Sequence, residues 1–148
     1  MVINDSAIAF IKFRKELSPD EVIETKYFNR KKHRHLTTKD GKQYYIIFKR
    51  EPFHSFSRIF NNNYGFGESL NQECLLSCVE KEVDMIIIIY QSGRIYGCSP
   101  KLWKQEAENN KWIRKVHKSL LVSSYGKKEY VPEVTYSIPL KFMIRYSN

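Results

Sequence analysis

The stretch VDMIIIIYQSGRIYGCSPK, residues 83–101, contains the pattern that decides the fold of this chain. Its unbroken apolar run at 85–89 predicts a strand buried on both faces, and therefore a central strand of a sheet. Gly93 predicts a tight turn, after which residues 94–98 return as a second strand. Asp84 stands at the start of the first strand. An acid there is either a metal ligand or the solvated first residue of the strand.

Helices are predicted on both sides of this hairpin. Residues 69–81 carry an apolar stripe at helical spacing, with Ser69 as the expected N-cap and a glutamine three residues later. The pair Ser99-Pro100 supplies a cap and a first helical residue for a second helix, which runs to about residue 110. The hairpin is therefore expected to lie between two helices in the sequence.

Three further elements are predicted before residue 68. Ser18 and the proline after it predict a helix from about residue 19 to about residue 28. Asp40-Gly41 predicts a hairpin whose second strand covers residues 43–49. Residues 51–67 predict a short helical turn followed by a loop rich in Asn and Gly.

The tail of the chain, residues 130–146, alternates as strands. Pro132 and Pro139 are expected to confine these strands to sheet edges or to end them. Taken together, the elements predict a single α/β or α+β domain over residues 1–148, with a mixed β-sheet flanked by helices.

Composition indicates a folded protein of a reducing compartment. Of the 148 residues, 42% are hydrophobic and 14% are aromatic, which is enough to build a core. No run reaches the roughly eighteen apolar residues of a membrane span, and the N-terminus lacks a signal-peptide pattern, so we expect a cytoplasmic protein with no membrane partner. Cys74 and Cys78 lie four apart on the helical stripe and lack zinc-site spacing, so we expect both to pack in the core.

Charge carries the clearest functional signal. The formal net charge is +9, from 25 Lys and Arg against 16 Asp and Glu. Such an excess favours a polyanionic partner, because each neutralised phosphate releases counterions. The positive charge gathers in residues 30–50 and 101–128, on either side of an acidic segment at 68–84. We therefore predict that the chain binds DNA or RNA through these two basic segments. The predicted contact residues are Arg30, Lys31, Lys32, His33, Arg34, His35, Lys42, Lys49, Arg50, Lys104, Lys111, Arg114 and Lys115.

Part of the chain suggests catalysis as well. A helix, a strand that begins with Asp84, a tight turn, a second strand and then Lys101 follow one another between about residues 73 and 110. This order resembles the core of the PD-(D/E)XK nucleases, which include Holliday-junction resolvases and RecB-like enzymes. The resemblance implies a nuclease in which Mg²⁺ is held by Asp84 and Lys101 orients the attacking water. The position two residues before that lysine is a serine here, so the second ligand would come from Glu68 or Glu73.

Three hypotheses therefore remain open. The first is a nucleic-acid-binding protein that needs no cofactor, and the second is a Mg²⁺-dependent endonuclease with Asp84, Glu73 and Lys101 at its centre. The third is a structural or protein-interaction subunit, a homodimer, that pairs through an exposed edge strand in the tail 130–146. Cleavage that requires Asp84 would separate the second hypothesis from the other two.

Overall fold

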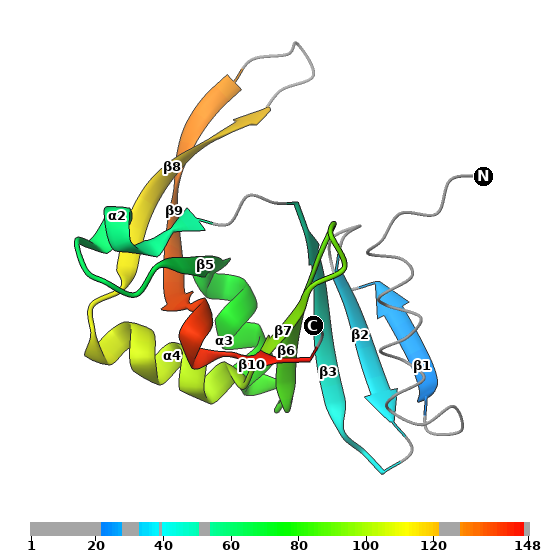
Figure 1. Ribbon diagram of the computed structural model, residues 1–148. Coiled ribbons are helices and arrows are strands. Elements are labelled where there is room, and N and C mark those ends of the chain that lie inside the picture. Colours follow the sequence, from blue (N-terminus) through cyan, green and yellow to red (C-terminus); the bar gives the residue numbers. More distant parts are fainter. Residues whose placement is uncertain (1–21, 28–32, 39, 51–53, 122–127, 147–148) are drawn as a thin grey trace.

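The computed structural model describes residues 22–27, 33–38, 40–50, 54–121 and 128–146. Within them the chain forms two β-sheets, with helices beside them (Figure 1). The first sheet has the strand order β1 (Val22–Tyr27), β2 (His33–Thr38), β3 (Gln43–Lys49), β6 (Met85–Tyr90), β7 (Ile95–Cys98) and β10 (Ile144–Arg145). The second has the order β4 (His54–Ser55), β5 (Phe66–Asn71), β9 (Lys128–Pro139) and β8 (Ile113–Leu121). The helical elements are α2 (Phe56–Phe60), α3 (Gln72–Glu80), α4 (Pro100–Asn109) and the 3-10 turn η1 (Leu140–Phe142).

Strand β6 lies in the middle of the first sheet, as its apolar run predicts. It pairs in parallel with β3 and antiparallel with β7, and the side chains of residues 86–90 are completely buried. The turn after it is tight because Gly93 adopts a φ of 96° and donates its N–H to the carbonyl oxygen of Tyr90 at 2.8 Å. The sheet contains both parallel and antiparallel pairs. The predicted mixed sheet flanked by helices is thus confirmed, and the fold is α+β.

The β2–β3 hairpin is also confirmed. Gly41 has a φ of 88°, a conformation that glycine adopts without a steric penalty. The N–H of Thr38 bonds to the carbonyl oxygen of Lys42 at 2.9 Å and closes the turn.

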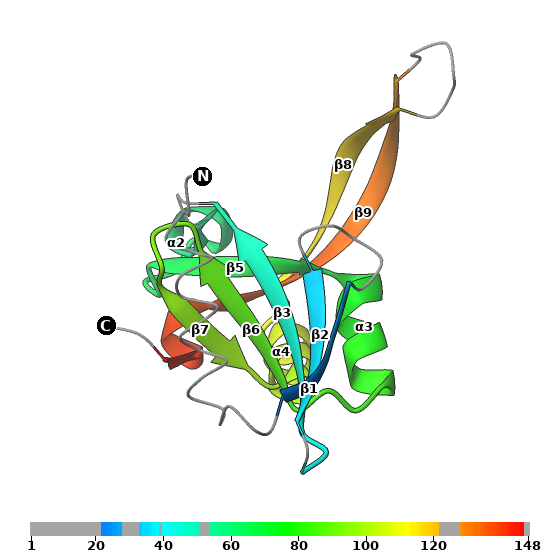
Figure 2. The ribbon, with the colours of Figure 1, turned by 90° about the vertical axis from the view of Figure 1, so that its right-hand side faces the viewer.

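The second sheet was not predicted from the sequence, and its longest pair forms a projecting arm. Strands β8 and β9 rise away from the rest of the molecule (Figures 1 and 2). Of the described residues of β9, only 135–139 pair with β5. At Pro132, β9 therefore has a paired neighbour among the described strands on the β8 side alone. The missing N–H of the proline is therefore compatible with its place inside a strand.

Two predicted helices differ from the structure. Residues 22–27, within the helix expected from residue 19, form strand β1 and pair with β2. The helix expected from Ser69 begins instead at Gln72, because residues 66–71 form β5 and pair with β9. Asn71 is the N-cap, and its side chain accepts from the backbone N–H groups of Glu73 and Cys74. In both places, strand pairing outweighs a local helix signal.

The other predicted elements are found where the sequence places them. Helix α2 is the short turn within residues 51–67, and α4 begins at Pro100 behind the cap Ser99. The tail forms strands, but residues 135–136 of β9 lie between β5 and β8. That part of the tail is not the exposed edge that the third hypothesis requires.

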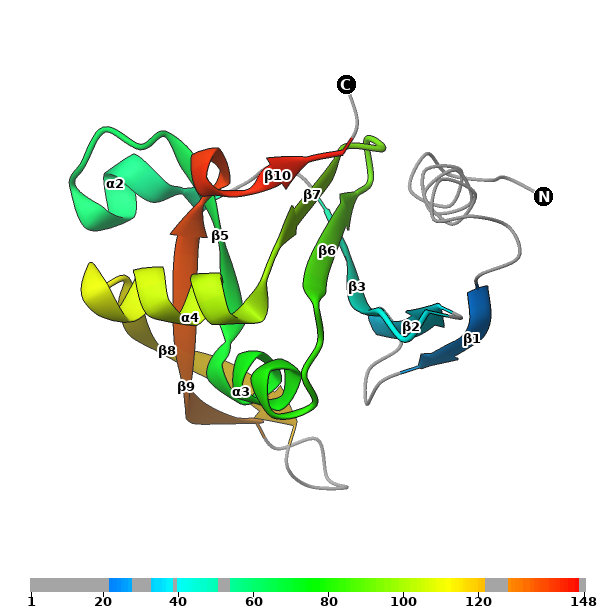
Figure 3. The same ribbon diagram turned by 90° about the horizontal axis from the view of Figure 1, so that it is seen from below.

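Helices α3 and α4 lie side by side and pack against β9 (Figure 3). The main core lies among these helices and both sheets. Trp103 of α4 is completely buried there, and its ring N–H donates to the carbonyl oxygen of Tyr136 at 2.9 Å. None of the helices in the described ranges is long and apolar enough to cross a membrane.

Candidate functional site

A cavity of about 360 Å³ lies where the two sheets meet. Strands β2 and β3 of the first sheet, β5, β8 and β9 of the second sheet, and helix α3 all contribute to its wall. Its side chains that can carry charge or donate hydrogen bonds include His33, Lys49, Asn71, Cys74, Arg114 and Glu133. Because six elements meet here, the cavity is a product of the tertiary fold and not of one motif.

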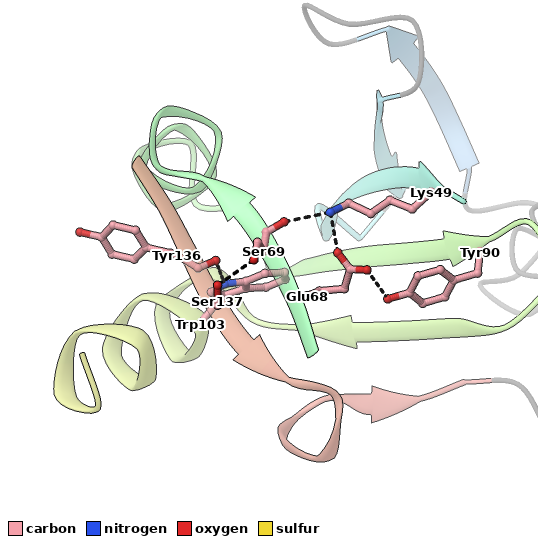
Figure 4. A network of polar contacts seen from close by, with 7 residues as sticks. All are labelled: Lys49, Glu68, Ser69, Tyr90, Trp103, Tyr136 and Ser137. Atoms are coloured by element: carbon pink, nitrogen blue, oxygen red, sulfur yellow. Dashed lines mark hydrogen bonds and ion pairs between the residues drawn. The ribbon is translucent and has the colours of Figure 1, made fainter. Parts of the chain in front are cut away.

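An ion pair crosses between the sheets beside this cavity (Figure 4). The Nζ of Lys49 lies 2.6 Å from a carboxylate oxygen of Glu68 and also donates to the carbonyl oxygen of Ser69 at 2.9 Å. The hydroxyl of Tyr90 donates to the other carboxylate oxygen at 2.9 Å. Glu68 is only 2% exposed, and a buried carboxylate is stable only when it is paired and hydrogen-bonded. This network connects β5 to the carboxyl ends of β3 and β6.

Asn71 connects helix α3 to the arm. Its amide N–H₂ donates to a carboxylate oxygen of Glu133 at 2.5 Å, while its side-chain oxygen caps the helix. One residue thus holds the first turn of α3 against β9. The cavity wall formed by these two elements is fixed by that contact.

A group of titratable side chains lies at β2, β3 and α3, and two of them, His33 and Cys74, line the cavity. The ring of His33 is buried, its Nδ1 is hydrogen-bonded to the hydroxyl of Tyr45, and the two rings meet edge to face at 5.3 Å between centroids. The side chains of Cys78, His33 and Tyr45 lie close enough to the sulfur of Cys74 to influence its ionisation. The Cys78 contact first, and then His33 and Tyr45, lower the pKa of Cys74 to about 5, although burial opposes the change.

The structure brings together three of the predicted nucleic-acid contacts. His33 and Lys49 from the first basic segment line the same cavity as Arg114 from the second. Lys42, Arg50, Lys111 and Lys115 are exposed.

Three further predicted contacts, Arg34, His35 and Lys104, are not among the residues that line the cavity. His35 bonds to the side chain of Gln43 at 2.8 Å, and Arg34 is half-buried on β2. Lys104 forms an ion pair with Glu108 on helix α4. Arg30, Lys31 and Lys32 lie outside the described residues.

The residues assigned to metal binding are separated in space. Asp84 is exposed and accepts the backbone N–H of Gln43 at 2.8 Å, at the amino ends of β3 and β6. Glu68 contacts Lys49 and Tyr90 at the opposite ends of the same two strands. Six residues of extended strand span about 20 Å. Asp84 and Glu68 are therefore too far apart to share one ion.

The two other residues of the nuclease hypothesis are exposed and lie on helices. Glu73 is in the first turn of α3, and Lys101 is in the first turn of α4. No three His, Cys, Asp or Glu side chains of the described ranges are grouped so that they could hold a metal ion. Asp84 and Glu68 are thus not a shared pair of ligands, and the pairing of Asp84 with Glu73 stays a prediction.

Sequence reasoning missed Asn71 and Glu133, and it assigned Cys74 to the core. The signal for Asn71 was present, since asparagine two residues before Glu73 is a common helix cap. Glu133 carried no local signal. Cys74 does pack against the main core as a partly buried side chain, and it also lines the cavity. Helical spacing identifies an apolar stripe without showing which edge of the stripe faces a cavity.

No protein-family model, curated protein or solved structure matches this chain. What the site can do chemically is inferred from its own residues.

Proposed function

We propose that this protein binds nucleic acid where its two basic segments meet, at the base of the β8–β9 arm. The observation that carries the proposal is the shared cavity. His33 and Lys49 come from residues 30–50, and Arg114 comes from residues 101–128. The acidic segment 68–84 separates these two regions in the sequence. Of these side chains, Lys49, which is also paired with Glu68, and Arg114 are positively charged. Gathered positive charges attract phosphate more strongly than scattered ones, because their potentials add.

The charge of the arm supports the same proposal. Residues 109–128, which include β8, contain six Lys and Arg and no Asp or Glu. Among them, Lys111, Arg114 and Lys115 are exposed. A cluster of exposed positive charge gives affinity for any phosphate backbone, without regard to base sequence.

The shape of the arm also suits a nucleic acid. The 9 residues of β8 make a ribbon about 30 Å long at about 3.3 Å per residue. A two-stranded ribbon fits the major groove of a duplex, and a charged one can also follow a single strand. Outside the part that pairs with β5, the described residues of the two strands pair only with each other. Such a ribbon is marginally stable by itself, and contact with a ligand would stabilise it.

The test measures affinity for labelled single-stranded and duplex DNA and RNA by fluorescence anisotropy over a series of salt concentrations. We expect the logarithm of affinity to fall linearly with the logarithm of salt concentration. The double variant Arg114→Ala, Lys115→Ala should bind more weakly. Its salt slope should be smaller in magnitude by about 1.4 to 1.8, because each lost phosphate contact removes about 0.7 to 0.9.

The matched control removes two positive charges elsewhere. Arg58 of α2 and Lys141 of η1 are exposed and lie outside both basic segments, so Arg58→Ala, Lys141→Ala should keep the wild-type salt slope. Equal losses in the two double variants would show that net charge alone is responsible and would overturn the proposed site. Absence of binding to all four nucleic acids at low salt would overturn the proposed function.

A further inference from the structure

The cavity at the base of the arm has a mixed wall. Ile47, Leu70 and Val116 supply apolar surface, whereas Arg114 and Glu133 supply charges of both signs. A site for phosphate alone would gain nothing from a carboxylate, because the two anions repel each other. The mixture suits a ligand that joins an anionic group to a flat apolar body with hydrogen-bond donors at its edge. A nucleotide has these three features.

The size of the cavity limits the ligand further. Its volume of about 360 Å³ is at the small end of the range of roughly 300–1,000 Å³ for ligand pockets. The cavity therefore suits one nucleotide and not a duplex.

The register of the arm brings the two charged groups to the same face. Arg114 is the partner of Thr135, and Val116 is the partner of Glu133. Alternate residues of a strand point to the same side, so these four side chains share one face, and all four line the cavity. Arg114 and Glu133 are diagonal neighbours, about 7–8 Å apart along the ribbon. A single ligand can therefore contact both.

Both charged groups keep hydrogen-bonding capacity for a ligand. Within the described part of the chain, the guanidinium of Arg114 makes no hydrogen bond and no ion pair. One oxygen of Glu133 accepts from the Asn71 amide at 2.5 Å, and no described residue donates to the other oxygen. Since an ionised carboxylate accepts about four hydrogen bonds, Glu133 can receive more. The bond to Asn71, which also caps α3, holds the carboxylate in place.

A carboxylate selects among the bases because it can only accept hydrogen bonds. Guanine offers two adjacent donors on its Watson–Crick edge, the ring N1–H and the N2 amino group. Adenine and cytosine have an acceptor nitrogen beside their amino group, and uracil and thymine have carbonyl oxygens on both sides of their N–H group. Each of these four bases would place a lone pair against the carboxylate. The Watson–Crick edge is accessible to a protein in an unpaired base.

We propose that the cavity holds one unpaired guanine nucleotide of a single-stranded nucleic acid. The Glu133 carboxylate accepts from the N1–H and the N2 amino group of the base, and the guanidinium of Arg114 donates to its phosphate. The apolar side chains of the wall contact the face of the base. This inference rests on the proposed function and adds a base preference to it, because phosphate contacts carry no base preference.

The test uses fluorescence anisotropy with four labelled uridine dodecamers that carry G, A, C or U at one central position, and with the matching thymidine DNA series. The single strand with guanine should bind at least about fivefold more tightly than the other three, as expected for a two-point contact with a base. The same sequences paired with their complements should show no preference, because their Watson–Crick edges are then occupied.

Two variants separate the base contact from the phosphate contact. In Glu133→Gln the amide oxygen can still accept from Asn71, which turns the amide N–H₂ toward the donors of guanine. The preference for guanine over adenine should disappear, with the salt slope unchanged. Arg114→Gln should weaken binding to all four single strands alike and lower the magnitude of the salt slope by about 0.7, with the guanine preference kept.

The matched control is Glu106→Gln on α4. Glu106 is half-buried and accepts from the amide of Asn110 at 3.1 Å, but it is not among the residues that line the cavity. Its variant should keep the guanine preference. Equal loss of the preference in Glu106→Gln and Glu133→Gln would show that net charge is responsible and would overturn the inference.

Equal affinity of the wild type for the four single strands would overturn this inference and leave the proposed function in place. Absence of binding to every strand and duplex at low salt would overturn both. Competition by free guanosine monophosphate and not by adenosine monophosphate, without a preference among the strands, would make the ligand a free nucleotide and overturn the assignment to a strand.

Discussion

Two lysines of this chain form ion pairs of the same length in different surroundings. The Nζ of Lys49 lies 2.6 Å from Glu68, and the Nζ of Lys104 lies 2.6 Å from Glu108. The side chain of Glu68 is 3% exposed, whereas that of Glu108 is 43% exposed. Water can solvate the carboxylate of Glu108 but cannot reach that of Glu68, so only the first pair is expected to matter for stability.

We predict that Lys49→Met destabilises the fold by about 2–4 kcal/mol, because among the described residues it leaves the buried Glu68 carboxylate with only the Tyr90 hydroxyl as a partner. The double variant Lys49→Met, Glu68→Leu should recover most of this loss, since no buried charge remains. Lys104→Met should cost less than about 0.5 kcal/mol. Urea unfolding of the four proteins gives the comparison. Equal destabilisation by the two single lysine variants would show that burial of Glu68 is not the cause.

For Asp84 the question is whether its carboxylate binds a metal ion or accepts a hydrogen bond from the backbone. Its oxygen accepts the N–H of Gln43 at 2.8 Å, and its own N–H donates to the Gln43 carbonyl oxygen at 2.9 Å. These bonds begin the parallel pairing of β3 and β6. We therefore assign Asp84 to the start of a strand.

We predict that Asp84→Ala costs about 1 kcal/mol, the usual net value of such a hydrogen bond, and that Asp84→Asn costs less because an amide oxygen can still accept. Thermal unfolding with and without Mg²⁺ tests the assignment. A shift of the midpoint by Mg²⁺ in the wild type that disappears in Asp84→Asn would restore the metal-site interpretation.

Among the elements, the β8–β9 arm is the most separate from the core. Its base pairs with β5 through residues 135–139, and the remainder of the register joins β8 to β9 alone. Lys118 and Val131 are register partners, so a two-residue turn can join them without changing the strands below. The arm can therefore be shortened without cutting into the body.

We predict that replacing residues 119–130 by Asn-Gly leaves the fold intact and weakens nucleic-acid binding at least tenfold, because the change removes two lysines and the outer third of the paired ribbon. Circular dichroism and thermal unfolding check the fold, and fluorescence anisotropy checks the affinity. Wild-type affinity in the shortened protein would limit the binding surface to the base of the arm and the cavity.

Two strands also show where a local sequence pattern predicts the wrong secondary structure. Residues 22–27 follow a good helix start but form β1, because the edge of the β2–β3 hairpin offers a ladder of hydrogen bonds. Residues 69–71 carry helical spacing but complete β5 against β9. In each case the partner strand lies later in the sequence, and a local window around the misassigned residues does not contain it.

For the whole molecule, local pattern was sufficient to place the centre of the first sheet and two of its connections. The run at 85–89 predicts burial on both faces because no polar side chain interrupts it. Gly41 and Gly93 predict their turns because few other residues adopt a positive φ cheaply. Ser99 and Pro100 predict the start of α4 for different reasons. The Ser99 side chain accepts a hydrogen bond from a backbone N–H group of the first turn, and Pro100 has no N–H group that would be left unpaired there.

The candidate site required the tertiary structure. Charge counting identified the two basic segments, but only the packing of the two sheets places His33, Lys49 and Arg114 around one cavity. Likewise, spacing placed Cys74 on an apolar stripe, and only the approach of β2 and β3 puts His33 and Tyr45 beside its sulfur. Turns, caps and buried strands depend on neighbours in sequence, whereas the second sheet and the cavity depend on contacts between residues far apart in the chain.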